Sequence, residues 1–162
     1  MQMERQRFTV AYLTPGLVPT EELQMWPQHM VLLTWFYGSK DTVMETLRQT
    51  LADLEPLKIK VGQLSSLSEE PVNLLDPLSA EQVTTLHNHL LGSFAAAGFV
   101  PEHMEHMGDG YIPHISIKKP HQRLRMGEIL NVDKLYLIAE TDRARHMRQV
   151  VGEVALNAKP TA

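Results

Sequence analysis

The sequence of 162 residues predicts an α+β fold. Three observations support this class: about seven short segments have the composition of β-strands, two longer segments have helical periodicity, and the two kinds follow one another in a mixed order. This length suits one domain with a sizeable core. We therefore expect a single domain over residues 1–162, with a short flexible tail from about residue 158.

The first predicted elements are two strands. Residues 7–13 are rich in β-branched and aromatic residues and run into a Thr-Pro-Gly turn, which indicates a buried strand. A loop-like stretch follows as far as Trp26, and a second strand is predicted over residues 29–37.

A helix is predicted next, capped by Asp41 and closed by Pro56. Its apolar residues recur at helical spacing. They are Val43, Leu47, Leu51 and Leu54. Residues 57–64 then alternate between apolar and polar side chains, as expected of a strand with one buried face.

The second predicted helix follows a short apolar run at residues 72–75 and a turn. Ser79 and Gln82 form a capping box at its start, and Gly98 stops it. The stripe that this helix buries consists of Val83, Leu86, Leu90, Phe94 and Ala97.

Three further strands are predicted toward the C-terminus. The first begins at His114 after a loop that bears histidines and methionines, and the others cover residues 135–139 and 150–156. Residues from Lys159 onward form the tail.

Composition excludes several classes of protein. The chain has no cysteine, which removes disulfides, thiolate nucleophiles and cysteine zinc sites. No apolar run approaches the roughly 20 residues that span a bilayer, and the N-terminus lacks the layout of a signal peptide. We therefore expect a cytoplasmic protein without a membrane partner.

The charge balance bears on the partner. A net charge of −4 argues against a protein that grips long nucleic acid through its phosphates and favours a small anionic ligand. Basic residues do cluster locally, after His114 and again near residue 145, and such clusters are usually solvated surface. The second cluster consists of Arg143, Arg145 and Arg148.

Two histidines, 85 positions apart (114 − 29), each open a strand-like apolar segment. Alternate side chains of a strand share a face, so His114 and Ser116 point the same way. Such a histidine can move a proton while the hydroxyl binds an anionic oxygen, and His29 across a cleft would complete an acid–base pair. The pair suggests phosphodiester chemistry without a metal. The alternative interpretation of His114 is a partly buried histidine that is hydrogen-bonded to its neighbours.

Two pairs of histidines, His87 with His89 and His103 with His106, invite a metal hypothesis because of their spacing. A metallohydrolase built on His103 and His106 is a distant alternative. Neither pair has the His-Glu-x-x-His arrangement, so we interpret all four as surface histidines.

The two histidine segments resemble the motifs of the 2H phosphoesterase superfamily, the 2′–5′ RNA ligase-like proteins. The second motif, His114-Ile115-Ser116-Ile117, is a close match and follows Pro113. The first, His29-Met30-Val31-Leu32, matches at the histidine and at the closing apolar residue. The resemblance extends over nearly the whole chain. It implies a bilobal fold of two related antiparallel-sheet lobes, with outer helices and a central cleft that has one histidine on each wall.

The resemblance also implies the activity: a phosphodiesterase acting on cyclic phosphates or 2′–5′-linked nucleotides, with no metal or other cofactor. The partner would be a small nucleotide or short oligonucleotide. His29 and His114 would be the acid and the base in an order left open, and Ser116 would bind phosphate. Lys118 or Lys119 would assist, Lys118 by strand geometry and Lys119 by family position. Aromatic side chains near the cleft would stack on a base. The candidates are Tyr12, Trp35 and Tyr111.

Val31 departs from the family pattern, which has threonine or serine at this position. Loss of one phosphate-binding donor can cost on the order of 10²–10³ in rate at comparable sites. Thr34 does not replace it in an ideal strand, because an odd offset places Thr34 on the other face. The sequence therefore leaves open a catalytically weakened protein that binds or sequesters nucleotides on the same fold.

Overall fold

The computed structural model describes residues 5–14, 16–24, 26, 28–67, 70–117 and 124–157. The predicted tail from residue 158 lies outside the described residues, and so do Lys118 and Lys119.

The described residues form eight strands, two α-helices and two short 3₁₀ turns, so the predicted α+β class is confirmed. The strands are β1 (Gln6–Leu13), β2 (His29–Gly38), β3 (Leu57–Leu67), β4 (Glu70–Leu75), β5 (His114–Ser116), β6 (Ile129–Val132), β7 (Lys134–Asp142) and β8 (Met147–Ala155). The helices are α1 (Lys40–Leu51) and α2 (Pro77–Ala96), and the turns are η1 (Met104–His106) and η2 (Gly108–Gly110).

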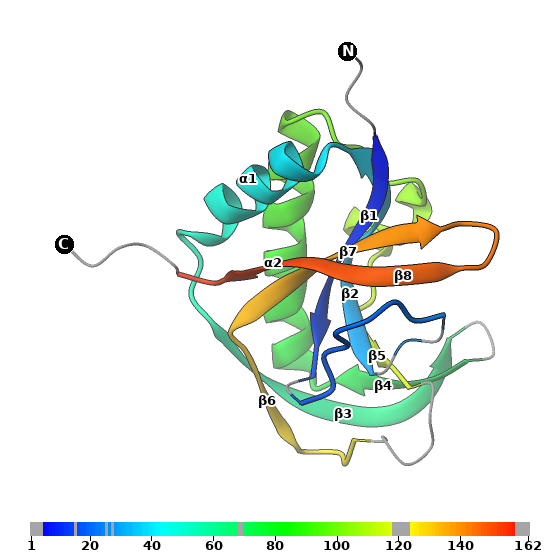
Figure 1. The fold of residues 1–162 in the computed structure, drawn as a ribbon. Helices are drawn as coiled ribbons and strands as arrows, with labels where there is room; N and C mark the ends of the chain where they lie inside the picture. Colours follow the sequence, from blue (N-terminus) through cyan, green and yellow to red (C-terminus); the bar gives the residue numbers. More distant parts are fainter. Residues whose placement is uncertain are drawn as a thin grey trace.

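The strands make one antiparallel sheet in the order β6-β3-β4-β5-β2-β1-β7-β8. The sheet divides into two halves of four strands, and β5 and β2 are the neighbouring strands where the halves meet. The sheet curls, and both helices lie on one side of it (Figure 1). The two strands that carry the predicted histidines are thus the two middle strands of the sheet.

The main core lies between the sheet and the helices. Helix α1 contributes Val43, Leu47 and Leu51, all fully buried, and α2 contributes Leu90 and Phe94. A smaller apolar cluster lies on the other face of β1 and β7, where Trp26 packs against Ala11 and Ile138. The sheet therefore has a helix-covered face and a second face that is only partly covered.

Several predicted helix details are wrong. Ser39, and not Asp41, precedes the first turn of α1, and Leu54 lies beyond the end of that helix. Helix α2 begins at Pro77, where the missing N–H of proline costs nothing, so Ser79 and Gln82 do not cap it.

The hydroxyl of Ser79 accepts a hydrogen bond of 2.8 Å from the backbone N–H of Lys60. Ala97, predicted on the buried stripe, is exposed just after α2. The predicted stop at Gly98 agrees with its φ of +91°. Strand β6 was not predicted.

An irregularity in β2 determines which side chains reach the open face. Between the pairs Phe8↔Phe36 and Ala11↔Val31, β2 uses two residues more than β1, and the register shifts lie on both sides of the pair Val10↔Leu33, which is the signature of β-bulges. The Thr9 hydroxyl donates to the Leu33 carbonyl at this point, at 2.5 Å. Leu32 and Leu33 are both fully buried in the main core, so the strict alternation assumed for Thr34 does not hold between Val31 and Thr34.

Candidate active site

The two predicted catalytic histidines and Ser116 lie on one face of adjacent strands. His29 on β2 is the direct cross-strand partner of Ser116 on β5, so their side chains share a face, and His114 shares it because it is two residues before Ser116. The neighbours Met30 and Ile115 point the other way and are fully buried in the main core. The sheet thus presents His29, His114 and Ser116 together, away from the helices.

The His114 ring is half-buried and has a defined tautomer. Its Nδ1 lies 2.7 Å from the carbonyl oxygen of Ile112. A carbonyl can only accept a hydrogen bond, so Nδ1 carries the proton. The neutral ring therefore presents an unprotonated Nε2, which can accept a proton from an attacking oxygen and can return it once the ring is charged.

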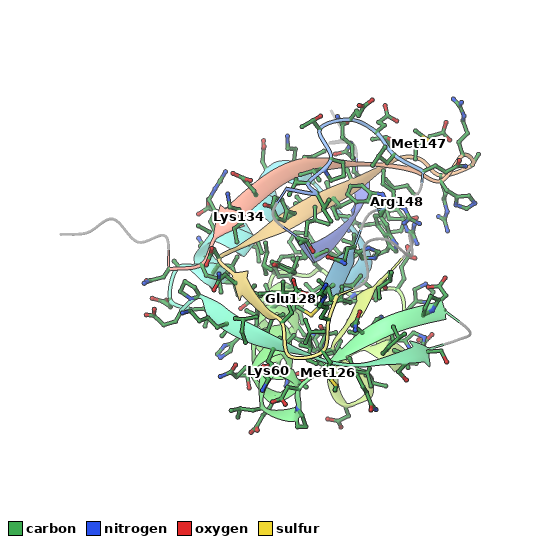
Figure 2. The ribbon with its side chains drawn as sticks, turned by 90° about the horizontal axis from the view of Figure 1, so that it is seen from below. Lys60, Met126, Glu128, Lys134, Met147 and Arg148 are labelled. Atoms are coloured by element: carbon green, nitrogen blue, oxygen red, sulfur yellow. The ribbon has the colours of Figure 1, made fainter. Side chains whose placement is uncertain are left out.

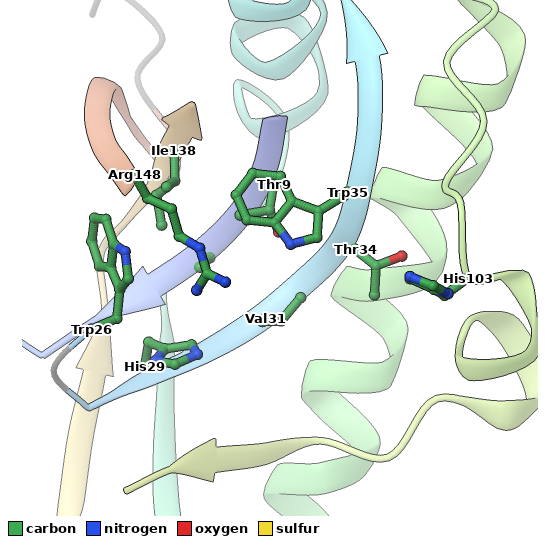
Figure 3. Close-up of a pocket in the computed structure, with 10 residues that line it drawn as sticks. Thr9, Trp26, His29, Val31, Thr34, Trp35, His103, Ile138 and Arg148 are labelled. Atoms are coloured by element: carbon green, nitrogen blue, oxygen red, sulfur yellow. The ribbon is translucent and has the colours of Figure 1, made fainter. Parts of the chain in front are cut away.

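A pocket of about 160 Å³ opens beside His29 on this face. Its lining residues come from β1, β2, β7, β8 and the loops around Trp26 and His103. They are Thr9, Ala11, Trp26, His29, Val31, Thr34, Trp35, His103, Ile138 and Arg148 (Figure 3). Of the aromatic residues predicted to contact a ligand, Trp35 lies in this pocket.

Val31 and Thr34 both line the pocket, which corrects the expectation that Thr34 points to the opposite face. The bulge of β2 between Val31 and Leu33 turns Thr34 toward the pocket, where its buried Oγ1 has no hydrogen-bond partner among the described residues. Figure 3 shows Thr34 beside His103, with Trp35 between it and Arg148. A threonine hydroxyl is therefore present on this strand, although at a position different from that of the family motif.

Two arginines flank the ring of Trp35. The Arg7 guanidinium carbon lies 4.7 Å from the ring centroid and that of Arg148 lies 5.4 Å from it, both within cation–π distance. Arg7 also forms ion pairs with Glu102 at 2.8 Å and Glu140 at 2.6 Å. Its charge is therefore compensated within the fold.

Arg148 differs from Arg7 because no carboxylate among the described residues pairs with it, and its buried Nε has no acceptor. Burial lowers the pKa of Arg148, with a smaller opposing effect from the charge of Glu140. The expectation of a solvated basic surface holds for Arg143 and Arg145, which are exposed, but is wrong for the half-buried Arg148. Strand alternation could have indicated the burial of Arg148, because Arg148 shares a face of β8 with the apolar Val150.

Tyr12 and Tyr111 do not have the predicted ligand-stacking positions. Tyr12 is 2% exposed in the main core, on the face opposite to Ala11, and burial raises its pKa to about 12. The ring of Tyr111 stacks on that of His87, with 3.9 Å between the centroids. Strand alternation explains Tyr12, since its two neighbours in β1 pack on the pocket side.

His87 is fully buried, which corrects its interpretation as a surface residue. Its Nδ1 donates to the Leu32 carbonyl at 2.6 Å, and its Nε2 accepts a hydrogen bond of 3.0 Å from the N–H of Gly108. Burial lowers the pKa of His87, so its ring is neutral. The residue lies four positions after Val83, on the apolar stripe of α2, and the spacing could have indicated this.

The other three histidines of the metal hypothesis are exposed, as expected: His89, His103 and His106. His103 lines the rim of the pocket. No group of three His, Cys, Asp or Glu side chains in the described part of the chain could hold a metal ion.

The profile of the 2′–5′ RNA ligase superfamily matches residues 7–129, which is most of the chain. The chain belongs to this superfamily. The resemblance to the 2H phosphoesterases is thus confirmed, and membership assigns the chain to a class of phosphoesterases. Among curated proteins, no sequence match is found.

Solved structures show the same fold. TT0787 of Thermus thermophilus superposes with a TM-score of 0.63 at 12% identity, covering 95% of this chain and 100% of that one. E. coli LigT complexed with NADP⁺ gives a TM-score of 0.60 at 14% identity, covering 95% of this chain and 99% of LigT. The predicted 2H phosphoesterase fold is confirmed by these matches. None of the helices in the described residues is long and apolar enough to cross a membrane.

Proposed function

We propose that this protein is a metal-independent phosphodiesterase that acts on cyclic phosphates or 2′–5′ linkages of small nucleotides. The observation that carries the proposal is the cross-strand pair of His29 and Ser116, with His114 on the same face. Two proton-transfer groups and one hydroxyl donor thereby flank one position above the β2–β5 boundary. Membership in the superfamily supports the phosphoesterase class.

Solved complexes of E. coli LigT contain 3′-AMP, ATP or NADP⁺. These ligands belong to LigT, and they support a nucleotide as the class of ligand for this chain as well. The absence of acidic side chains among the described pocket residues is compatible with an anionic ligand.

In the proposed hydrolysis, the oxygen of a water molecule bonds to phosphorus while the bond from phosphorus to one ribose oxygen breaks. One histidine takes the proton that the water loses, and the other histidine gives a proton to the departing ribose oxygen. The tautomer of His114, held by the Ile112 carbonyl, suits its Nε2 to either role. Ser116 donates to a non-bridging oxygen as negative charge develops there. Lys118 or Lys119 remains a predicted second contact.

One observation favours a second function, a nucleotide-binding protein with little turnover. Val31 lines the pocket directly beside His29 and offers no hydrogen-bond donor. A ligand could bind while its transition state is stabilised poorly. The two functions differ in turnover and agree in the class of ligand.

The test is a hydrolysis assay with EDTA present, on 2′,3′-cyclic nucleotides and 2′–5′-linked dinucleotides. The natural protein is compared with His29→Ala and His114→Ala, and with His106→Ala as the matched control on an exposed histidine. We expect both active-site variants to lose about 10²-fold or more in kcat and the control to keep its rate. Activity that survives either substitution would contradict the two-histidine mechanism. Binding without turnover in the natural protein would favour the second function.

A further inference from the structure

We propose that Arg148, with Trp26 and Trp35, forms a subsite for a second phosphate group of the substrate, separate from the phosphate that reacts between the histidines. This inference rests on the proposed function for the position of the reacting phosphate. The evidence for the subsite itself is that two buried hydrogen-bond donors of the pocket, Arg148 Nε and Trp26 Nε1, have no acceptor among the described residues.

Arg148 is a half-buried cation that forms no ion pair with a carboxylate among the described residues. Its backbone is held by a pair of hydrogen bonds with Leu23, of 2.9 and 3.0 Å. Its guanidinium lies over Trp35, and its buried Nε has no acceptor. A half-buried charge without an ionic partner raises the free energy of the folded protein. An anion that binds beside Arg148 would offset this cost. Glu140 does not fill this role because it is engaged by Arg7.

Trp26 provides a second, independent donor. It is 3% exposed, and its Nε1 has no hydrogen-bond partner among the described residues. Figure 3 shows the nitrogen side of this indole turned toward the Arg148 side chain. Arginine and tryptophan side chains only donate hydrogen bonds. The complementary group must therefore accept several hydrogen bonds and carry negative charge, which describes phosphate oxygens.

The order of strands separates this subsite from the reacting phosphate. The reacting phosphate lies at the boundary of β2 and β5, where His29 faces Ser116. Arg148 is on β8, three strands beyond β2 in the order β2-β1-β7-β8. At about 4.8 Å between neighbouring strands, the two backbones are roughly 14 Å apart across the sheet. The Arg148 side chain crosses part of that span and ends over the ring of Trp35, six residues from His29 along β2.

The two views of the molecule agree with this placement. Figure 2 shows Arg148 with β8 in one half of the molecule, whereas Lys60 and Met126 lie in the half that contains β3. In Figure 3 the Arg148 guanidinium reaches into the pocket from the side opposite to Thr34. The guanidinium thus lies on the β8 side of the pocket, away from the boundary of β2 and β5.

The ligand class is therefore a nucleotide with at least two phosphates. The second phosphate has two sources of the same chemistry: a terminal 5′-phosphate on a mononucleotide, or the internucleotide phosphate of a short oligonucleotide whose end is cyclic. Trp35 lies beside the subsite and offers an apolar wall to the sugar or base that joins the two phosphates.

The experiment compares three substrates on the full chain. They are adenosine 2′,3′-cyclic phosphate, its 5′-phosphorylated form, and an unphosphorylated dinucleotide that ends in a 2′,3′-cyclic phosphate. Arg148→Gln is compared with Arg145→Gln, a control on an exposed arginine three residues away.

We expect Arg148→Gln to lose about 10- to 100-fold in kcat/KM on substrates with a second phosphate, and less than about 3-fold on the simple cyclic nucleotide. The control should follow the natural protein. The substrate that is most affected identifies the source of the second phosphate. An equal loss on all three substrates, or no loss on any, would overturn the subsite.

A binding measurement keeps this test separate from that of the proposed function. Calorimetry compares adenosine 3′,5′-bisphosphate with adenosine 3′-monophosphate, neither of which needs to react. A preference for the bisphosphate that disappears in Arg148→Gln supports the subsite even in a protein without turnover. Equal affinities in the natural protein would overturn it. If Arg148→Gln does not fold, Arg148→Lys is used, which retains the charge but not the fork of donors, and an intermediate preference is expected.

Discussion

The Tyr111 hydroxyl donates a hydrogen bond of 2.8 Å to the backbone carbonyl of Val31, two residues beyond His29. The same ring stacks on His87, whose Nδ1 donates to the carbonyl of Leu32. Two successive carbonyls of β2 are therefore held by side chains from α2 and from the segment before β5. This arrangement ties the strand of His29 to the segment that leads to His114.

Removal of the Tyr111 hydroxyl should weaken this tie. We expect Tyr111→Phe to lower the free energy of unfolding by about 1 kcal/mol, because the partly buried Val31 carbonyl loses a donor. The matched control is Tyr37→Phe, whose hydroxyl contacts Arg143 at an exposed position. Urea unfolding of both variants checks this expectation, and equal stabilities would contradict it.

Buried His87 should make the fold sensitive to acid. Burial lowers its pKa in the folded state, whereas the unfolded chain has a histidine pKa near 6.5. Above that value neither state binds the proton. As the pH falls below about 6.5, the unfolded state gains a proton that the folded state does not, so stability falls by up to about 1.4 kcal/mol per pH unit.

Urea unfolding at pH 7, 6 and 5 tests this sign on the natural protein and on His87→Gln. The free energy of unfolding of the His87→Gln variant should fall less steeply as the pH decreases. The difference between the two slopes should correspond to about one bound proton. His89→Gln, on the exposed side of α2, should keep the slope of the natural protein. A slope that is the same in all three proteins would show that His87 does not govern the acid response.

The ion pairs of Arg7 should contribute more to the free energy of unfolding than the exposed ion pair between Lys134 of β7 and Glu153 of β8. Arg7→Met leaves Glu140, whose side chain is 8% exposed, without its partner, and we expect a loss on the order of 3 kcal/mol. Lys134→Met breaks the exposed pair with Glu153 and should cost less than about 1 kcal/mol. Thermal and urea unfolding compare the two. A small effect at Arg7 would mean that water replaces the pair at Glu140.

Val31→Thr tests whether the departure from the family motif limits turnover. The new hydroxyl lies beside His29 on the pocket face, so the rate of cyclic phosphate hydrolysis should rise by about 10-fold or more. Val150→Thr, on β8, is the control for placing a hydroxyl at a half-buried position. An unchanged rate in Val31→Thr, with the fold intact, would indicate that another donor already binds the phosphate. Thr34→Val then tests whether that donor is the Thr34 hydroxyl.

Local pattern is enough to predict much of this fold. Alternation in two short segments correctly predicts the shared faces of His29 with Val31 and of His114 with Ser116. The apolar stripe of α2 follows from its spacing, apart from Ala97, which is exposed beyond the helix, and His87, whose polar ring conceals a buried position. At this residue, position along the helix decides burial more than side-chain chemistry does.

The rest depends on contacts between distant residues. The bulge in β2 exists only in its pairing with β1, so the inward turn of Thr34 could not be read from β2 alone. Arg148 is half-buried because the loop around Leu23 and Trp26 folds back over β8. A run of arginines close in sequence gives no sign that one of them is covered.

The pocket contains both tryptophans of the chain, Trp26 and Trp35. Their intrinsic fluorescence therefore comes entirely from the walls of this one pocket, with an arginine against one of the rings. Any ligand that enters changes the surroundings of both emitters, so an unlabelled optical titration reads occupancy directly. The natural protein is its own sensor for screening candidate nucleotides before any product is assayed.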